Sequence, residues 1–125
     1  FEGLPVTATV DDAARLLLAT TQQEFPVSDG AGRLRGMVTR DGIVQALGQA
    51  GGGTPVLDMM VKDVPEIRAA AALQDVLQLM QKAQTSFVAV TDPSGAFQGY
   101  ISRENLAELI LVQTSRDRYA AGQRG

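Results

Sequence analysis

Apolar residues recur along this chain with two different spacings. Between residues 11 and 21, and again between residues 73 and 83, they return every three or four positions, which predicts an amphipathic helix in each segment. Each predicted helix is followed by two short apolar runs separated by turn-forming residues, a pattern typical of a β-hairpin. The predicted hairpin strands cover residues 25–27 and 34–39 in the first half, and residues 87–90 and 97–102 in the second half.

This succession of elements occurs twice, 63 positions apart. Residues 29–40 align with residues 92–103 without a gap, and Asp, Gly, Gly and Arg occupy identical places in the two segments. Further apolar positions predict a short strand before each first helix, and second helices over residues 41–48 and 104–112. The sequence therefore predicts an α/β (α+β) fold of two tandem β-α-β-β-α repeats related by a pseudo-twofold axis, with any binding site between them.

The same pattern divides the chain into parts. We expect repeat one, a glycine-rich linker, repeat two and a polar tail to occupy residues 1–47, 48–55, 56–113 and 114–125. Repeat two begins with an apolar lead-in, residues 56–63, and the counterpart of this lead-in for repeat one would lie before Phe1. We therefore expect the chain to be a fragment that begins inside its first repeat.

Composition narrows the range of functions. The chain has 125 residues, a net charge of −3, and neither cysteine nor histidine. The absence of histidine removes the commonest metal ligand and the commonest general base, so we expect no catalysis, no metal and no required cofactor. Lysine and arginine are scattered, which argues against nucleic-acid binding. No run of 18 apolar residues occurs, so we expect no membrane span in this chain.

Three other patterns have structural explanations. The glycine-rich residues 48–53 lack the following lysine that a phosphate-binding P-loop needs, so we interpret them as a linker. Asp11 and Asp12 are adjacent on a helix and cannot face each other as a catalytic pair, whereas Thr9 and Asp12 have the spacing of a helix capping box. Met59, Met60 and Met80 are expected to fill the core, because no cysteine or histidine accompanies them as a metal ligand.

The junction between each hairpin and the following helix is the strongest candidate site. Residues 36–42 and 99–105 each contain a glycine, two apolar residues and a Thr or Ser at the predicted helix start. The hydroxyls of Thr39 and Ser102 either bind a phosphate oxygen beside free helical N–H groups or simply cap the helix. In the second junction, Asn105 follows one helical turn later, where its side chain can hydrogen-bond ribose hydroxyls.

Taken together, these motifs resemble the cystathionine-β-synthase (CBS) domain, two of which in tandem form a Bateman module. The resemblance covers residues 1–112. It implies a regulatory module whose clefts between the repeats bind AMP, ADP, ATP or S-adenosylmethionine, and which often forms a homodimer. It also implies a parent catalytic or transport domain in the same chain, whose activity the ligand adjusts by favouring one arrangement of the repeats.

The resemblance assigns a nucleotide site mainly to repeat two. Ser102 would contact phosphate and Asn105 the ribose, while Phe87 and Val88 would line the adenine side. Arg103 and its counterpart in repeat one, Arg40, either favour phosphate or are solvated residues at a helix start.

Repeat one departs from the family pattern. Thr39 is in place, but Gly42 occupies the Asp or Asn position, and Asp41 comes one residue early. An offset of one residue turns a side chain by roughly 100° around a helix. We therefore expect at most one good nucleotide site, with Thr39 and Asp41 as the weaker candidates.

Residues 36–47 also resemble CBS pairs at the C-terminus of site-2-protease-type membrane zinc metallopeptidases. This resemblance implies that the chain is cytoplasmic, as the cytosolic regulatory end of such a protease. The zinc-binding His-Glu-x-x-His helix of the peptidase itself cannot exist in a chain without histidine. The alternative is a module that binds no ligand and only dimerises its parent, which the degenerate repeat one favours and the Ser102/Asn105 pair opposes.

Overall fold

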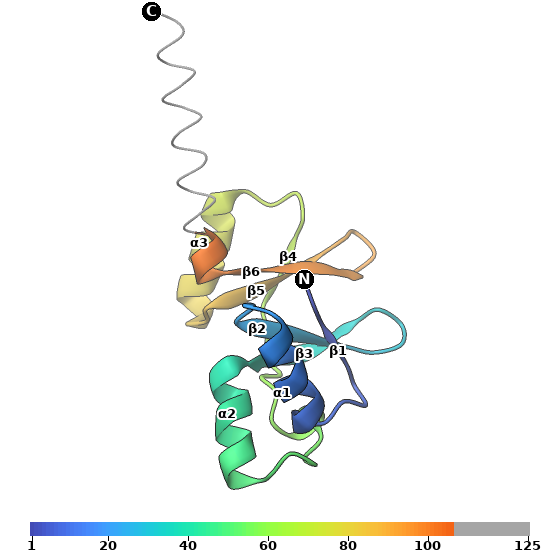
Figure 1. Ribbon diagram of the computed structural model, residues 1–125. Coiled ribbons are helices and arrows are strands. Elements are labelled where there is room, and N and C mark those ends of the chain that lie inside the picture. The colour runs from blue at the N-terminus through green and yellow to red at the C-terminus, as the bar shows by residue number, and fades with distance from the viewer. Residues whose placement is uncertain (107–125) are drawn as a thin grey trace, which may run out of the picture.

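The computed structural model describes residues 1–106, which form two similar repeats stacked with their hairpins between the helices (Figure 1). Repeat one consists of β1 (Leu4–Pro5), α1 (Val10–Ala19), β2 (Glu24–Ser28), β3 (Leu34–Thr39) and α2 (Arg40–Gln49). A short 3-10 helix, η1 (Val56–Asp58), precedes repeat two, which consists of β4 (Glu66–Arg68), α3 (Leu73–Ala83), β5 (Phe87–Thr91) and β6 (Phe97–Ser102). Residues 103–106 are helical, and the remainder of the predicted helix 104–112 lies outside the described residues. The predicted α+β fold of two similar repeats is confirmed.

The two sheets have the same topology. In each three-stranded sheet the entry strand pairs in parallel with the first hairpin strand, which pairs in antiparallel with the second. The register shifts between Val27 and Ser28 in the first sheet and between Val90 and Thr91, 63 positions later, in the second. The duplication therefore extends to the β-bulge, a local irregularity that sequence alone did not indicate.

The aspartates at the start of the hairpin turns explain why Asp and Gly recur there. The carboxylate of Asp29 accepts backbone N–H bonds from the second and fourth residues after it, at 2.9 and 3.1 Å, and Asp92 does the same at 2.9 Å in both cases. Gly32 and Gly95 have φ angles of +78° and +88°, which favour glycine. Each loop is thus closed by the same Asp-x-x-Gly arrangement.

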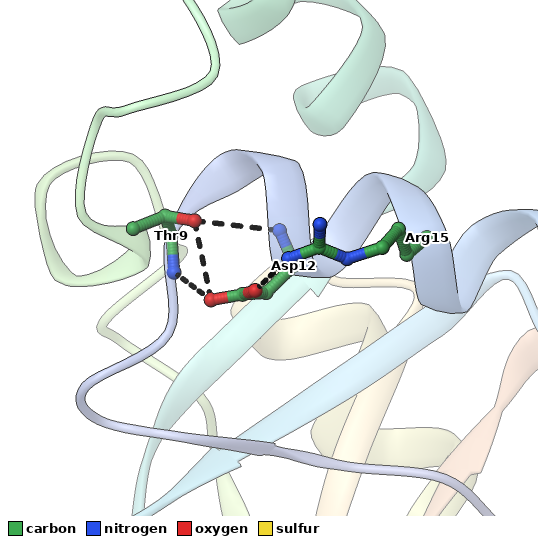
Figure 2. A network of polar contacts seen from close by, with 3 residues as sticks. All are labelled: Thr9, Asp12 and Arg15. Carbon is green, nitrogen blue, oxygen red and sulfur yellow. Dashed lines mark hydrogen bonds and ion pairs between the residues drawn. The ribbon is translucent and has the colours of Figure 1, made fainter.

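The start of α1 shows the predicted capping box (Figure 2). The hydroxyl of Thr9 accepts the backbone N–H of Asp12 at 3.4 Å, and the Asp12 carboxylate accepts the backbone N–H of Thr9 at 2.9 Å. That backbone bond, together with the contact from Arg15, lowers the pKa of Asp12. The helix ends at Ala19 rather than at residue 21, because Thr20 adopts an extended conformation.

The segment between the repeats is hydrogen-bonded to repeat one and packs against it. The N–H groups of Val10 and Asp11 donate to backbone carbonyls in the glycine-rich segment, at Thr54 and Gly52. Val56 is fully buried in the core of repeat one. Residues 50–61 therefore cover repeat one, although the duplication relates the lead-in 56–63 to repeat two.

Every helix within residues 1–106 is too short or too polar to cross a bilayer. The same residues contain no group of three or more acidic side chains that could hold a metal ion.

Candidate ligand-binding clefts

Two of the hollows where the repeats meet contain residues that the sequence predicted for the site. The larger hollow, the axial cleft, has a volume of about 530 Å³. Its lining residues are Gln23, Glu24, Thr39, Arg40, Asp41, Ser86, Arg103 and Glu104. The lining includes three equivalent pairs of residues: 23 and 86, 40 and 103, and 41 and 104. The axial cleft is therefore lined by matching positions of the two repeats.

The smaller hollow, the side cleft, has a volume of about 310 Å³. Its lining residues are Phe1, Thr21, Gln22, Gln23, Glu24, Tyr100, Ser102, Glu104 and Asn105. Residues 21–24 connect α1 to the start of β2 in repeat one, whereas residues 100–105 form the end of β6 and the helix start in repeat two. A ligand in the side cleft would therefore contact both repeats at once.

The sequence-predicted site residues fall into three places. Ser102 and Asn105 line the side cleft together. Thr39, Asp41 and Arg103 line the axial cleft.

Phe87 and Val88, the predicted adenine-side residues, are buried at the start of β5. Val88 belongs to the core of repeat two, and neither residue lines the axial or the side cleft. The side cleft therefore contains the predicted phosphate and ribose contacts, Ser102 and Asn105, but not the predicted adenine-side residues.

Both candidate hydroxyls cap the helices that follow them. The Thr39 hydroxyl accepts the backbone N–H of Gly42 at 3.0 Å, and the Ser102 hydroxyl accepts that of Asn105 at 3.1 Å. A hydroxyl that accepts one bond still has its own proton to donate. Helix capping and ligand contact are therefore compatible roles for these two side chains.

Arg40 has a different role from the two expected for it. Its guanidinium donates to three backbone carbonyls at the end of α1 and beyond, those of Leu17 at 3.2 Å, Thr20 at 2.6 Å and Gln22 at 3.0 Å. These bonds satisfy carbonyls that have no partner within the helix. Arg40 is therefore a structural C-terminal cap for α1.

Arg103 is held much less firmly than Arg40. Its backbone N–H donates to the Ser86 carbonyl at 2.8 Å, and within residues 1–106 its guanidinium has one contact, 3.4 Å long, with the Thr85 carbonyl. Its side chain is exposed. The cationic group of Arg103 is thus the one better able to meet a ligand in the axial cleft.

Sequence reasoning missed the polar group formed by Glu24, Tyr100 and Glu104. Partial burial, together with the nearby charge of Glu104, raises the pKa of Glu24. The Tyr100 hydroxyl donates to the backbone carbonyl of Glu24 at 3.1 Å, and burial together with the Glu24 charge raises the pKa of Tyr100 to about 12. One signal was present in the sequence: Glu24 occupies the position that corresponds to Phe87, so a charge replaces an aromatic residue between the repeats.

The counterpart of the side cleft in repeat one is covered. Val61 exchanges two backbone hydrogen bonds with Met37 of β3, at 2.9 and 2.8 Å. A Cβ atom at Gly36 would lie 2.6 Å from the Val61 carbonyl oxygen and 2.7 Å from Sδ of Met60. At Gly99, the corresponding residue, the nearest atom would be in the ring of Phe1 at 3.6 Å. The lead-in segment therefore lies against β3 in repeat one, whereas among residues 1–106 the neighbour of the corresponding glycine in repeat two is Phe1.

Comparison with known proteins identifies the family and agrees with the fold. The model of the family described as the CBS domain matches residues 3–49 and 56–112. A homoserine O-acetyltransferase from Methanocorpusculum labreanum is 31% identical over 107 residues, which are 86% of this chain. The chain spans about a fifth of the length of that relative, 22%.

Three solved structures show the same fold. A Vibrio cholerae protein named for acetoin utilization (AcuB) is 22% identical, with a TM-score of 0.81 over 94% of this chain and 88% of the other. CBSX2 from Arabidopsis thaliana, a CBS-pair protein, is 25% identical, with a TM-score of 0.78 over 93% of this chain and 89% of the other. A CBSX2 structure in complex with AMP is 24% identical, with a TM-score of 0.75 over 90% of this chain and 89% of the other.

Proposed function

Because the chain belongs to the CBS domain family, a family of regulatory modules, we propose that it binds an adenosine ligand in the side cleft and reports its presence to a parent protein. The candidate ligands are AMP, ADP, ATP and S-adenosylmethionine, and the AMP complex of CBSX2 supports this class. The observation that carries the proposal is that Ser102 and Asn105 meet residues 21–24 of the other repeat in one cleft. A ligand held there favours one arrangement of the two repeats over others.

In this proposal the residues have separate tasks. Ser102 donates its hydroxyl proton to the ligand, Asn105 bonds the ribose, and Phe87 and Val88 provide the apolar packing behind the adenine side. Arg103, Thr39 and Asp41 face the axial cleft, where they would contact any part of the ligand that extends beyond the side cleft.

The parent protein has two candidates. The sequence of residues 36–47 resembles CBS pairs of site-2-protease-type peptidases, which favours a membrane zinc metallopeptidase with this module on the cytoplasmic side. The similarity to part of a homoserine O-acetyltransferase favours a metabolic enzyme instead. The sequence of the parent gene decides between them, because only the peptidase carries a His-Glu-x-x-His motif and membrane spans.

A module that only joins two copies of the parent is the alternative, and exposed apolar residues favour it. Leu18 at the end of α1 is 86% exposed, and Val44 and Leu47 on α2 are 64% and 41% exposed. Val44 and Leu47 lie one helical turn apart, and an exposed apolar patch commonly marks an interface. Self-association and ligand binding are compatible, so a homodimer is also part of the proposal.

The ligand proposal is tested by thermal shift with AMP, ADP, ATP and S-adenosylmethionine, followed by calorimetry on Asn105→Ala. At 1 mM, a ligand with a dissociation constant of about 10 µM would add roughly 2.7 kcal/mol to the unfolding free energy. Losing the ribose bond should weaken binding by about 1–3 kcal/mol. Gln81→Ala, which removes an exposed amide from α3 at a residue that lines neither cleft, is the control and should bind normally. If no ligand shifts the melting temperature, the dimerisation role replaces this proposal.

A further inference from the structure

The charged side chains that line the side cleft are acidic. Two carboxylates, those of Glu24 and Glu104, line it, and no lysine or arginine of residues 1–106 does. Two arginines line the adjoining axial cleft, where the guanidinium of Arg40 is already bound to three carbonyls and the side chain of Arg103 is exposed. Within residues 1–106, a ligand seated against Ser102 and Asn105 would therefore meet two carboxylates and no lysine or arginine side chain, the other charge on a lining residue being the terminal ammonium of Phe1.

The backbone fixes Glu24 at this place. Glu24 is the first residue of β2, and its carbonyl accepts both the Tyr100 hydroxyl, at 3.1 Å, and the Gln22 side-chain amide, at 2.6 Å. Within the described part of the chain, neither its carboxylate nor that of Glu104 accepts a hydrogen bond that would spread its charge. The field of Glu24 also reaches Tyr100, whose pKa it helps to raise.

Phosphate groups are poorly matched to such a cleft. A phosphate placed near a carboxylate in a partly desolvated site is repelled, and each added phosphate increases the repulsion. A sulfonium or ammonium group placed there is attracted instead. The neutral parts of an adenosine ligand, its ribose and base, are not affected by either carboxylate to a comparable extent.

We propose that Glu24 and Glu104 are specificity residues that make the side cleft prefer adenosine ligands with a positively charged substituent over phosphorylated ones. This inference rests on the proposed function, because it assumes that the cleft binds an adenosine ligand. It gives the order of affinity as sulfonium-bearing ligand first, then AMP, then ADP, then ATP. The axial cleft, with Arg103, does not reverse this order, because Glu24 and Glu104 line that cleft as well.

The test is calorimetric titration of the whole chain with adenosine, S-adenosylmethionine, S-adenosylhomocysteine, AMP and ATP. S-Adenosylhomocysteine lacks only the methyl group and the sulfonium charge, so its comparison with S-adenosylmethionine isolates the effect of charge. We expect S-adenosylmethionine to bind at least about tenfold more tightly than ATP, and the difference to shrink as salt screens the carboxylates. Glu24→Gln and Glu104→Gln should each weaken the binding of S-adenosylmethionine, strengthen the binding of ATP and leave the affinity for adenosine unchanged.

Asp63→Asn is the control, since it removes one carboxylate from an exposed position outside both clefts and changes the net charge equally. This variant should bind every ligand as the unchanged chain does. If ATP binds as tightly as S-adenosylmethionine, or if the two glutamine variants leave their ratio unaltered, the charge preference is wrong while adenosine binding stands. If adenosine and all its derivatives fail to bind, both the proposed function and this inference fall.

Discussion

The two repeats follow the same path but differ in what lies against the second strand of each hairpin. In repeat one, Val61 is hydrogen-bonded to β3, and Met60 lies against Gly36. In repeat two, the corresponding place beside Gly99 is bordered by the ring of Phe1, which packs edge-on against Phe97 and Tyr100. Within residues 1–106, the equivalent positions thus pack against a lead-in segment in one copy and against an aromatic ring in the other.

The two hairpin-to-helix junctions of the duplicated fold are alike in one respect and different in others. Both junctions keep the hydroxyl that caps the following helix, so capping alone does not distinguish them. What distinguishes the junctions is the covering segment and a few substitutions at equivalent positions, such as Gly42 for Asn105 and Glu24 for Phe87. The chemistry of the site depends on these differences, whereas the fold depends on what the two copies share.

The largest expected effect comes from filling the matched glycines. Gly36→Ala places a methyl group 2.6 Å from the Val61 carbonyl oxygen, which is backbone and must move, whereas Gly99→Ala meets only a ring atom at 3.6 Å. We expect the first variant to lose about 2–3 kcal/mol of unfolding free energy and the second to change by less than about 0.5 kcal/mol. Urea unfolding of the two variants measures both values. Equal losses would show that the lead-in does not hold closely against β3.

A smaller contrast is expected for the matched arginines. Arg40→Ala removes a guanidinium that binds three carbonyls at the end of α1, and we expect a loss of about 1–2 kcal/mol. Arg103→Ala removes one long contact to the Thr85 carbonyl and should cost less than about 0.5 kcal/mol. Chemical denaturation of the two variants under the same conditions provides the comparison. A larger loss for Arg103→Ala would contradict the assignment of Arg40 as the helix cap.

The features that the sequence predicted well are local or duplicated. The helix of 73–83 and both hairpins were predicted from spacing, and the capping box at Thr9 and Asp12 from a three-residue interval. The end of α1 was placed too late, since helical spacing of apolar residues does not show where Thr20 turns to an extended backbone. Errors of this kind are expected at helix ends, because few residues determine them.

Contacts between distant segments could not be predicted in the same way. That residues 56–61 cover repeat one, and that Glu24 lies near Glu104 and Tyr100, depends on how the two sheets are placed relative to each other. No local pattern encodes that placement. The roles of Ser102 and Asn105 came from a resemblance to a family, and the structure adds the cleft that they share with residues 21–24.

The smallest expected effect is a pH dependence of the melting temperature. Glu24 in repeat one can cause it, whereas its equivalent in repeat two, Phe87, has no ionisable group. Burial and the charge of Glu104 raise the pKa of Glu24, so the folded state favours its protonated form. The resulting stabilisation is fully present below the ordinary pKa of a glutamate and is lost as pH rises through the raised value. Glu24→Gln should therefore melt about 1–3 °C higher than the unchanged chain at pH 7 and at the same temperature near pH 3.5. Asp63→Asn, measured in parallel, should show no such gain at pH 7. An increase in melting temperature of equal size at both pH values would mean that glutamine improves packing, and that the charge of Glu24 does not destabilise the folded state.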